Sequence, residues 1–238
     1  MINNKTVLAV VPARGGSKGV KLKNLRPVQG VPIVQLAGTI ASQVPEIDRA
    51  VVSTDLDKIA EAAVAGGLVD AFRRPESISG DRVSDVEVLT HALETMEQID
   101  DRRYDIVVML QPTSPMRTVA HVTDTIHKLE FEDFDAVWTV SETDSKSHPL
   151  KQLVLPEGRM DYYDPDGANI IARQQLEPVY HRNGLAYALT RECLLEQQSL
   201  LGQRAGAVVC NGHFVSIDTE WDFEYVEFIL SQRQRSRI

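Results

Sequence analysis

Residues 6–24, TVLAVVPARGGSKGVKLKN, decide how this chain is organised. The apolar run from Val7 to Val11 has the length and composition of a buried strand, and Pro12 ends it. Three glycines, two cations and a hydroxyl follow within residues 14–19. Glycines let backbone N–H groups approach an anion, and the cations balance its charge. A buried strand that ends in such a loop is typical of a polyphosphate-binding site.

The distribution of charge supports an anion site near the N-terminus. The first 45 residues contain six lysines and arginines and no acidic residue, although the 238-residue chain has a net charge of −9. A solvated surface loop is the alternative, because glycine and lysine are common in loops. The loop directly follows a predicted buried strand, where open parallel sheets bind their ligands, and this favours the anion site.

Two common nucleotide-binding motifs are absent from this loop. The P-loop pattern needs a lysine and then Ser or Thr after its second glycine, whereas Gly19 follows Lys18, and G-x-G-x-x-G does not occur. The loop resembles the N-terminal motif of the acylneuraminate cytidylyltransferases, the CMP-sialic acid synthetases. In that family it cradles the triphosphate of CTP. The resemblance therefore implies nucleotide contacts from Ala13, Arg14, Gly15, Gly16, Ser17, Lys18, Lys23 and Asn24.

The composition is that of a soluble globular protein with one main domain. Apolar residues make up 43% and charged residues 25% of the chain. The acidic balance argues against a nucleic-acid binder. Two cysteines without metal-ligand spacing indicate a reducing cytoplasm. The N-terminus has no signal-peptide pattern, and no apolar run approaches the ~20 residues of a membrane helix, so we expect a cytoplasmic protein without a membrane segment.

The order of predicted elements indicates an α/β fold. Strands are predicted over residues 7–11, 49–53, 68–72, 106–110 and 134–140, with helices over 31–41, 54–65, from 84 and from about 119. Alternating strands and helices predict a three-layer, mostly parallel sheet. Thr219 and Asp222 are expected to cap a final helix that turns Trp221, Tyr225 and Phe228 inward.

Residues 72–85, FRRPESISGDRVSD, resemble the second motif of the same family. That motif has an arginine before a proline and then a run rich in serine and aspartate. The resemblance implies that Arg74 and Ser84 face the nucleotide. The alternative is structural, because Ser84-x-x-Glu87 is a capping box that would begin the next helix.

The heptapeptide QPTSPMR, residues 111–117, is the most specific match. It differs from the QPTSPLR string of the family only by Met for Leu, and it follows a predicted buried strand. The alternative is a rigid turn before the next helix, since its two prolines stiffen the chain. The resemblance makes Gln111 and Arg117 candidates for the place where nucleotide and sugar acid meet.

Residues 141–182 are polar and broken by prolines and glycines, with a predicted hairpin around residues 156–158. Such a small excursion cannot bury a core of its own, so we expect it to pack on a partner chain. The family consists of homodimers with a dimerisation arm, and the resemblance implies the same here. The predicted organisation is a nucleotidyltransferase core of residues 1–140 and 183–238, with the extended arm 141–182 inserted in it.

The resemblance also implies a sugar-acid pocket. An arginine fork and a lysine suit a carboxylate, and asparagine and tyrosine bind hydroxyls. For Tyr187 the alternative is a half-buried core aromatic. The aromatic pair that lines the acyl pocket of the family has no clear counterpart here. The substrate-binding residues implied by the match are Gln111, Lys151, Arg173, Asn183 and Tyr187.

The last motif, residues 215–220, reads VSIDTE where the family commonly has V-D-I-D-T-E. Ser216 replaces the first aspartate, which leaves Asp218 as the one expected carboxylate for Mg²⁺. One carboxylate with the triphosphate is a plausible magnesium site, because this ion keeps waters and substrate oxygens as ligands. The resemblance assigns catalytic roles to Arg14, Lys18 and Asp218.

Five motifs in family order imply a nucleotidyltransferase fold that resembles the GT-A glycosyltransferases. The implied reaction transfers CMP from CTP to the anomeric hydroxyl of a nonulosonic acid and releases pyrophosphate. Two alternatives stay open. The chain is a cytidylyltransferase for another sugar acid, such as Kdo, legionaminic or pseudaminic acid, or a catalytically silent nucleotide-binding dimer. The sequence identifies no general base.

Overall fold

A six-stranded sheet forms the centre of the molecule in the computed structural model, which describes residues 1–235. Its strand order is β10-β6-β9-β5-β1-β4. The pairs β1–β4, β1–β5 and β10–β6 are parallel, and β9 runs antiparallel to β5 and β6. The strands are β1 (Val7–Pro12), β4 (Arg49–Ser53), β5 (Ile106–Met109), β6 (Ala136–Glu142), β9 (Tyr180–Thr190) and β10 (Ala205–Val209).

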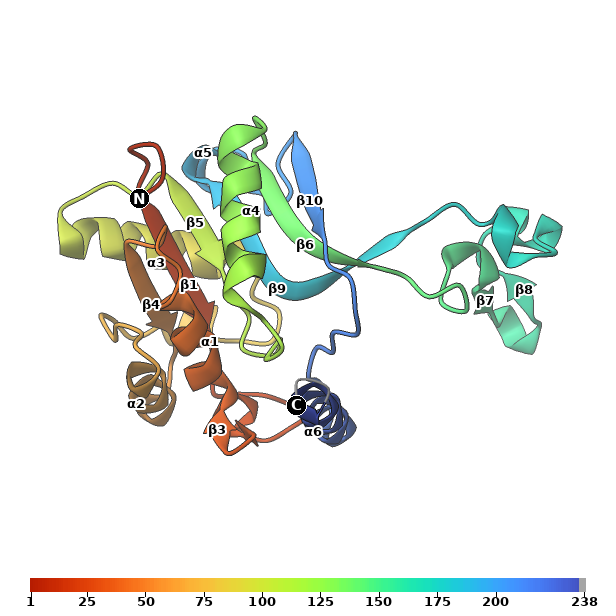
Figure 1. Ribbon diagram of the computed structural model, residues 1–238, viewed down its shortest axis with the longest axis horizontal. Helices are drawn as coiled ribbons and strands as arrows, with labels where there is room; N and C mark the ends of the chain where they lie inside the picture. The colour runs from red at the N-terminus through yellow and green to blue at the C-terminus, as the bar shows by residue number, and fades with distance from the viewer. Residues whose placement is uncertain (236–238) are drawn as a thin grey trace.

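Helices cover both faces of this sheet and make three layers (Figure 1). One face carries α1 (Ile33–Ala41), α2 (Asp57–Ala65) and α4 (Val119–Phe131). The other carries α3 (Asp85–Asp100) and α5 (Arg191–Leu195). The mostly parallel, three-layer α/β architecture predicted from the alternating pattern is therefore confirmed.

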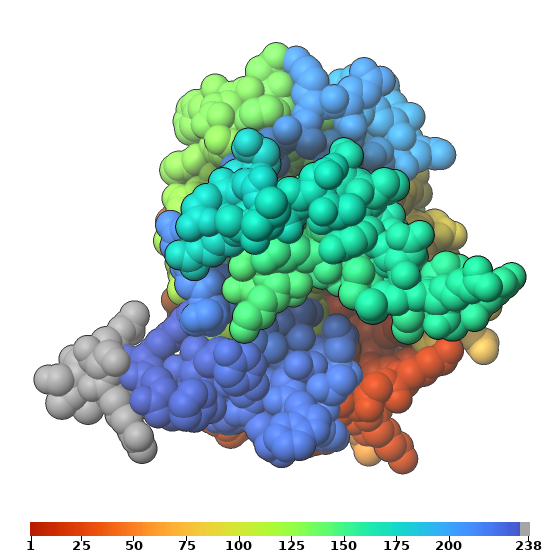
Figure 2. Space-filling model, turned by 90° about the vertical axis from the view of Figure 1, so that its right-hand side faces the viewer, coloured from red at the N-terminus to blue at the C-terminus, as the bar shows by residue number. Residues whose placement is uncertain are grey.

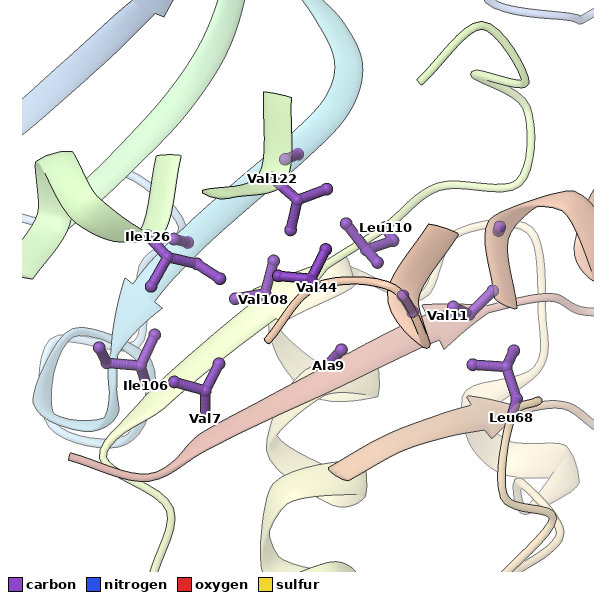
Figure 3. Close-up of a cluster of buried hydrophobic side chains, with 14 of the residues drawn as sticks. Val7, Ala9, Val11, Val44, Leu68, Ile106, Val108, Leu110, Val122 and Ile126 are labelled. Atoms are coloured by element: carbon purple, nitrogen blue, oxygen red, sulfur yellow. The ribbon is translucent and has the colours of Figure 1, made fainter. Parts of the chain in front are cut away.

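The central strands are buried on both sides, which explains their continuous apolar sequences. Successive side chains of a strand point to opposite faces, so Val7, Ala9 and Val11 of β1 pack on the face of α4. Figure 3 shows them beside Val108 of β5, with Val122 of α4 above. The alternate residues of β1, Leu8 and Val10, pack with α3 on the opposite face.

The last helix, α6 (Glu220–Arg235), packs beside the N-terminal loop rather than on the central sheet. Its buried side chains are Phe223 and Val226. The prediction that Trp221, Tyr225 and Phe228 face inward is wrong, because they are 77%, 48% and 59% exposed. The helix carries apolar residues on two faces, so its 3.6-residue period does not determine which face is buried.

The chain between β6 and β9 extends away from the sheet as an arm (Figure 1). It holds the short pair β7 (Leu153–Val154) and β8 (Asp161–Tyr162), so the predicted hairpin forms but is shorter than expected. Figure 2 shows the arm in teal in front of the core, with α6 below it. Single 3-10 turns make up most of the rest: η3 (Pro149–Lys151), η4 (Pro156–Gly158), η5 (Pro165–Asn169) and η6 (Arg173–Gln175).

Smaller elements complete the part of the chain that the structure describes. The predicted strand at residues 68–72 is reduced to one bridge between Val51 and Val69. The helix predicted over residues 54–65 begins later than expected, since Leu56 is the N-cap of α2. Within residues 1–235, no helix is long and apolar enough to cross a membrane. The remaining elements are η1 (Lys23–Leu25), β2 (Pro27–Val28), β3 (Val31–Pro32) and η2 (Glu76–Ile78).

Candidate active site

A cavity of about 510 Å³ opens where β1 and β5 end. Both strands are parallel, so the loops that follow them leave the same edge of the sheet. The cavity therefore collects residues from four of the motifs seen in the sequence. Its polar and charged lining is Arg14, Ser17, Lys18, Lys23, Asn24, Arg74, Asp81, Asp85, Gln111, Thr113 and Asp218.

The glycine-rich loop is held in place by its backbone. The N–H of Gly15 donates to the Asp55 carboxylate at 2.7 Å, and the Asn24 amide donates to the carbonyl of Arg14 at 3.0 Å. A Cβ on Gly19 would lie 2.4 Å from the carbonyl oxygen of Asp218, so only glycine allows this close approach. The loop is thereby fixed against the last motif, about 200 residues later in the chain.

Arg14, Lys18 and Lys23 are each paired with a carboxylate in this structure. Asp81 forms ion pairs with Arg14, at 2.5 Å, and with Lys18. Lys23 donates to the Asp218 carboxylate and to the carbonyl of Ile217, both at 2.9 Å. The hydrogen bonds from Lys18 and Arg14 hold the pKa of Asp81 below its usual value. An incoming polyphosphate would exchange these carboxylates for its own oxygens.

Arg74 is buried at the side of the cavity beneath the loop. Its guanidinium donates to the hydroxyl of Ser53 at 3.1 Å and to the carbonyl of the same residue. Burial lowers its pKa to about 10, against the attraction of Asp55. Arg74 therefore stays protonated at neutral pH and adds a fixed positive charge to the cavity.

The loop after β5 is braced by Arg117, which the match to QPTSPLR had made a candidate for the site. Its guanidinium donates to the carbonyls of Gln111, at 2.6 Å, of Gly184, at 3.1 Å, and of Leu185. Burial lowers the pKa of Arg117 to about 9. Since its donors are used on backbone oxygens, Arg117 shapes the loop and presents Gln111 rather than lining the cavity itself.

Gly184 explains how Gln111 is oriented. It has φ +72°, in a region that L side chains rarely adopt, and it lies within the irregularity where β9 pairs with β6. A Cβ there would lie 2.7 Å from the Gln111 side-chain oxygen. The Asn-Gly pair of the sequence therefore gives the Gln111 side chain the space that it occupies at the cavity wall.

The structure brings six of the ten nucleotide residues implied by the resemblance to the cavity wall. Ala13, Gly15, Gly16 and Ser84 are not among its lining residues. Ser84 is the N-cap of α3 and forms a complete capping box with Glu87, as the alternative reading of this segment predicted. Of the residues implied for the sugar acid, only Gln111 lines the cavity within one chain.

The other four sugar-acid candidates are placed differently. Asn183 is buried and donates to the hydroxyl of Ser141 at 3.0 Å. Tyr187 is 2% exposed and its ring lies 4.9 Å from that of Trp138, as expected of a core aromatic. Lys151 and Arg173 are exposed on the arm. Their assignment to a sugar-acid pocket stays a prediction.

Two carboxylates of the cavity were not selected from the sequence. Asp81 and Asp85 both belong to the run of Ser and Asp that follows Arg74-Pro75. That run was visible, but periodicity does not determine which side chains of an irregular loop point inward. The turn η2 and the start of α3 direct both carboxylates toward the cavity.

The residues near Asp218 offer oxygen ligands of the kind that Mg²⁺ prefers. The Asp218 side chain is 75% exposed and lines the cavity. The N–H of Ile217 donates to the carbonyl of Thr113 at 2.8 Å, and the hydroxyls of Ser216 and Thr113 lie 3.5 Å apart. No group of three or more metal-binding side chains occurs within residues 1–235. The donor set thus fits an ion that takes most of its ligands from substrate and water.

One family of known proteins matches nearly the whole chain. Residues 8–234 match the family model described as cytidylyltransferase. The chain belongs to this family. The resemblance indicated by the sequence motifs is thereby confirmed, and the protein is an enzyme of the cytidylyltransferase type.

Two relatives resemble this cytidylyltransferase in sequence over most of its length. It is 29% identical to CMP-N,N'-diacetyllegionaminic acid synthase of Legionella pneumophila, over 98% of this chain and 99% of the relative. It is 30% identical to N-acylneuraminate cytidylyltransferase of Streptococcus agalactiae, over 92% of this chain, and the match covers 52% of that relative's length.

The fold of this cytidylyltransferase also matches a solved structure. A CMP:2-keto-3-deoxy-manno-octonic acid synthetase, in complex with CTP, superposes with a TM-score of 0.69 at 20% identity. The match covers 96% of this chain and all of the other. At that identity the comparison supports the nucleotidyltransferase fold alone.

Proposed function

We propose that this cytidylyltransferase transfers CMP from CTP to the anomeric hydroxyl of a nonulosonic, sialic-type acid and releases pyrophosphate. The observation that carries the proposal is the cavity in which Arg14, Lys18 and Lys23 face Asp218 and Gln111. Its cationic side suits a triphosphate, and its far side has room and polar groups for an acceptor. The named substrates of the relatives support a sugar acid as that acceptor.

In the proposed reaction the sugar hydroxyl attacks the α-phosphorus and pyrophosphate leaves in line. Arg14, Ser17, Lys18 and Lys23 would hold the triphosphate and the departing pyrophosphate by charge-assisted hydrogen bonds. Arg74 would hold the nucleotide from the buried side of the cavity. The chain's contribution is positioning and neutralisation of charge, without a covalent enzyme intermediate.

Asp218 would hold a Mg²⁺ ion together with oxygens of the substrate. When bound, this ion would neutralise charge on the phosphates. Lys23 pairs with Asp218 at 2.9 Å and is positioned to move its ammonium onto a phosphate oxygen when the carboxylate takes a cation.

A homodimer is part of the same proposal. The arm exposes Leu155, Met160, Tyr163 and Ile171, which a second copy would cover. Lys151 and Arg173 lie on this arm and outside the cavity of their own chain. An arm that crosses to the partner would bring both cations toward the partner's cavity, where a sugar carboxylate needs them.

The alternatives within the family concern the acceptor. The relative that this chain matches over nearly its full length acts, by its name, on a legionaminic acid, so the acceptor panel must include that sugar. Purified protein is incubated with CTP, Mg²⁺ and one of N-acetylneuraminic, legionaminic, pseudaminic and Kdo acids, and pyrophosphate is measured. We expect turnover with a nonulosonic acid. CTP binding without pyrophosphate release from any acceptor would instead support a silent nucleotide-binding dimer.

A further inference from the structure

The cavity contains a carboxylate, that of Asp85, to which the family resemblance assigns no role. Asp85 is the first residue of α3, and it lines the cavity with Val88, one helical turn further on, and with Gln111 at the end of β5. It interacts electrostatically with Arg74 and with Tyr187, which the family resemblance assigns to the acceptor.

Asp85 differs from the other two carboxylates of the cavity in its partners. Asp81 is paired with Arg14 and Lys18, and Asp218 with Lys23. Among residues 1–233, whose side chains the structure describes, no group donates a hydrogen bond to the Asp85 carboxylate and no cation forms an ion pair with it. No histidine lines the cavity in this part of the chain.

Helix capping does not explain this carboxylate. The Ser84–Glu87 box caps α3, and although Asp85 and Glu87 both place negative charge in its first turn, neither feature gives the Asp85 carboxylate a hydrogen-bond donor. An unpaired, partly buried carboxylate is costly unless a ligand supplies its hydrogen bond. Asp85 is thus available to accept a hydrogen bond from a hydroxyl in the cavity.

The charged and titratable groups that act on Asp85 come from two other segments. Arg74 approaches from the segment before η2, and Arg182 and Tyr187 from β9. Burial raises the pKa of Asp85, and the two arginines oppose this rise. The carboxylate is therefore a stronger base than that of Asp81, whose pKa is lowered.

We propose that Asp85 is the general base of the reaction and takes the proton of the attacking sugar hydroxyl. This inference rests on the proposed function. The hydroxyl oxygen forms its bond to the α-phosphorus as its proton passes to Asp85. The bond from the α-phosphorus to the bridging oxygen breaks, and pyrophosphate leaves with that electron pair. Protonated Asp85 then returns its proton to water.

The test compares Asp85→Asn and Asp85→Glu with the control Glu94→Gln, which removes a charge from the same helix outside the cavity. We expect Asp85→Asn to bind CTP as the wild type does and to lose kcat by about 10²-fold or more. The wild type should lose kcat as the pH falls through the raised pKa of Asp85, and this acid limb should be missing from the residual activity of Asp85→Asn. Asp85→Glu should recover part of kcat and keep an acid limb.

Three results would overturn the assignment. A kcat of Asp85→Asn within about tenfold of the wild type would exclude a general base at this position. Loss of CTP binding in Asp85→Asn would show a role in nucleotide binding or folding instead, and an unchanged acid limb would assign the proton transfer to another group. Wild-type protein that binds CTP but turns over no sugar acid would overturn the proposed function itself, and the assignment of the base with it.

Discussion

Apolar side chains are buried in the six-stranded core but exposed in the arm between β6 and β9. In the core, Leu8 and Val10 pack on one face of β1 while Val7, Ala9 and Val11 pack on the other. In the arm, Leu155 is 69% and Met160 72% exposed. The core is therefore stabilised by contacts within one chain, whereas the proposed homodimer would bury the apolar surface of the arm.

This contrast predicts different effects of truncating a leucine in each region. Leu8→Ala empties a fully buried position and should lower the free energy of unfolding by about 2–5 kcal/mol. Leu155→Ala removes an exposed side chain and should change the unfolding of the monomer by less than about 0.5 kcal/mol. Urea unfolding, measured at a concentration where the protein is monomeric, distinguishes the two.

Leu155 of the arm should also stabilise the proposed dimer. Leu155→Ala is expected to raise the dissociation constant of the dimer, whereas Val64→Ala, on the exposed side of α2, should leave it unchanged. Sedimentation velocity over a concentration series measures this. A wild-type monomer with full turnover at micromolar concentration would contradict the role given to the arm.

Asp218→Asn tests the cavity of the core, whose lining residues all come from one chain. It should reduce turnover by about 10²-fold or more, because the charge of the phosphates is then poorly neutralised. Ser216→Ala should cost far less, since a hydroxyl is a weak magnesium ligand, and Ser216→Asp should lower the Mg²⁺ concentration needed for half-maximal turnover. Near-normal turnover of Asp218→Asn would place the metal elsewhere.

Lys18→Ala and Arg14→Ala should weaken CTP binding more than sugar-acid binding. Each removes a cation from the loop after β1, and a charge-assisted hydrogen bond contributes about 1.5–3 kcal/mol. The expected loss is about 10- to 100-fold in CTP affinity, measured by calorimetry. Lys5→Ala, a cation paired with Glu130 far from the loop, is the control. Unchanged CTP affinity in both loop variants would contradict the triphosphate site.

Asp81→Asn should have the smallest effect, and in the opposite direction. Its carboxylate competes with the nucleotide for Arg14 and Lys18, so its removal should tighten CTP binding about two- to fivefold. Because the pKa of Asp81 is lowered, the competition is complete at neutral pH and is lost as the pH falls through that pKa. The gain should therefore disappear at acid pH, and weaker CTP binding by the variant would mean that Asp81 serves the bound state.

The sequence alone determined four strands of the sheet, β1, β4, β5 and β6, most helices and the position of the glycine-rich cationic loop. Buried parallel strands are continuous apolar runs, so they can be recognised from local sequence. A glycine-rich cationic loop directly after such a strand is typical of an anion-binding site. The same holds for the capping box at Ser84, whose partners lie three residues apart.

Tertiary structure decided which polar residues meet in the cavity. Arg117 lies in the most specific motif, yet it braces the backbone of β9, because only the folded sheet places three carbonyls around its guanidinium. Asp81 lies in an irregular segment without a period to orient it, and Asp85 stands at the first position of α3. The helix α6 carries apolar residues on two faces, so its period does not select the buried one. For Arg117 and α6 the deciding contacts are to residues distant in the chain, which local sequence does not encode.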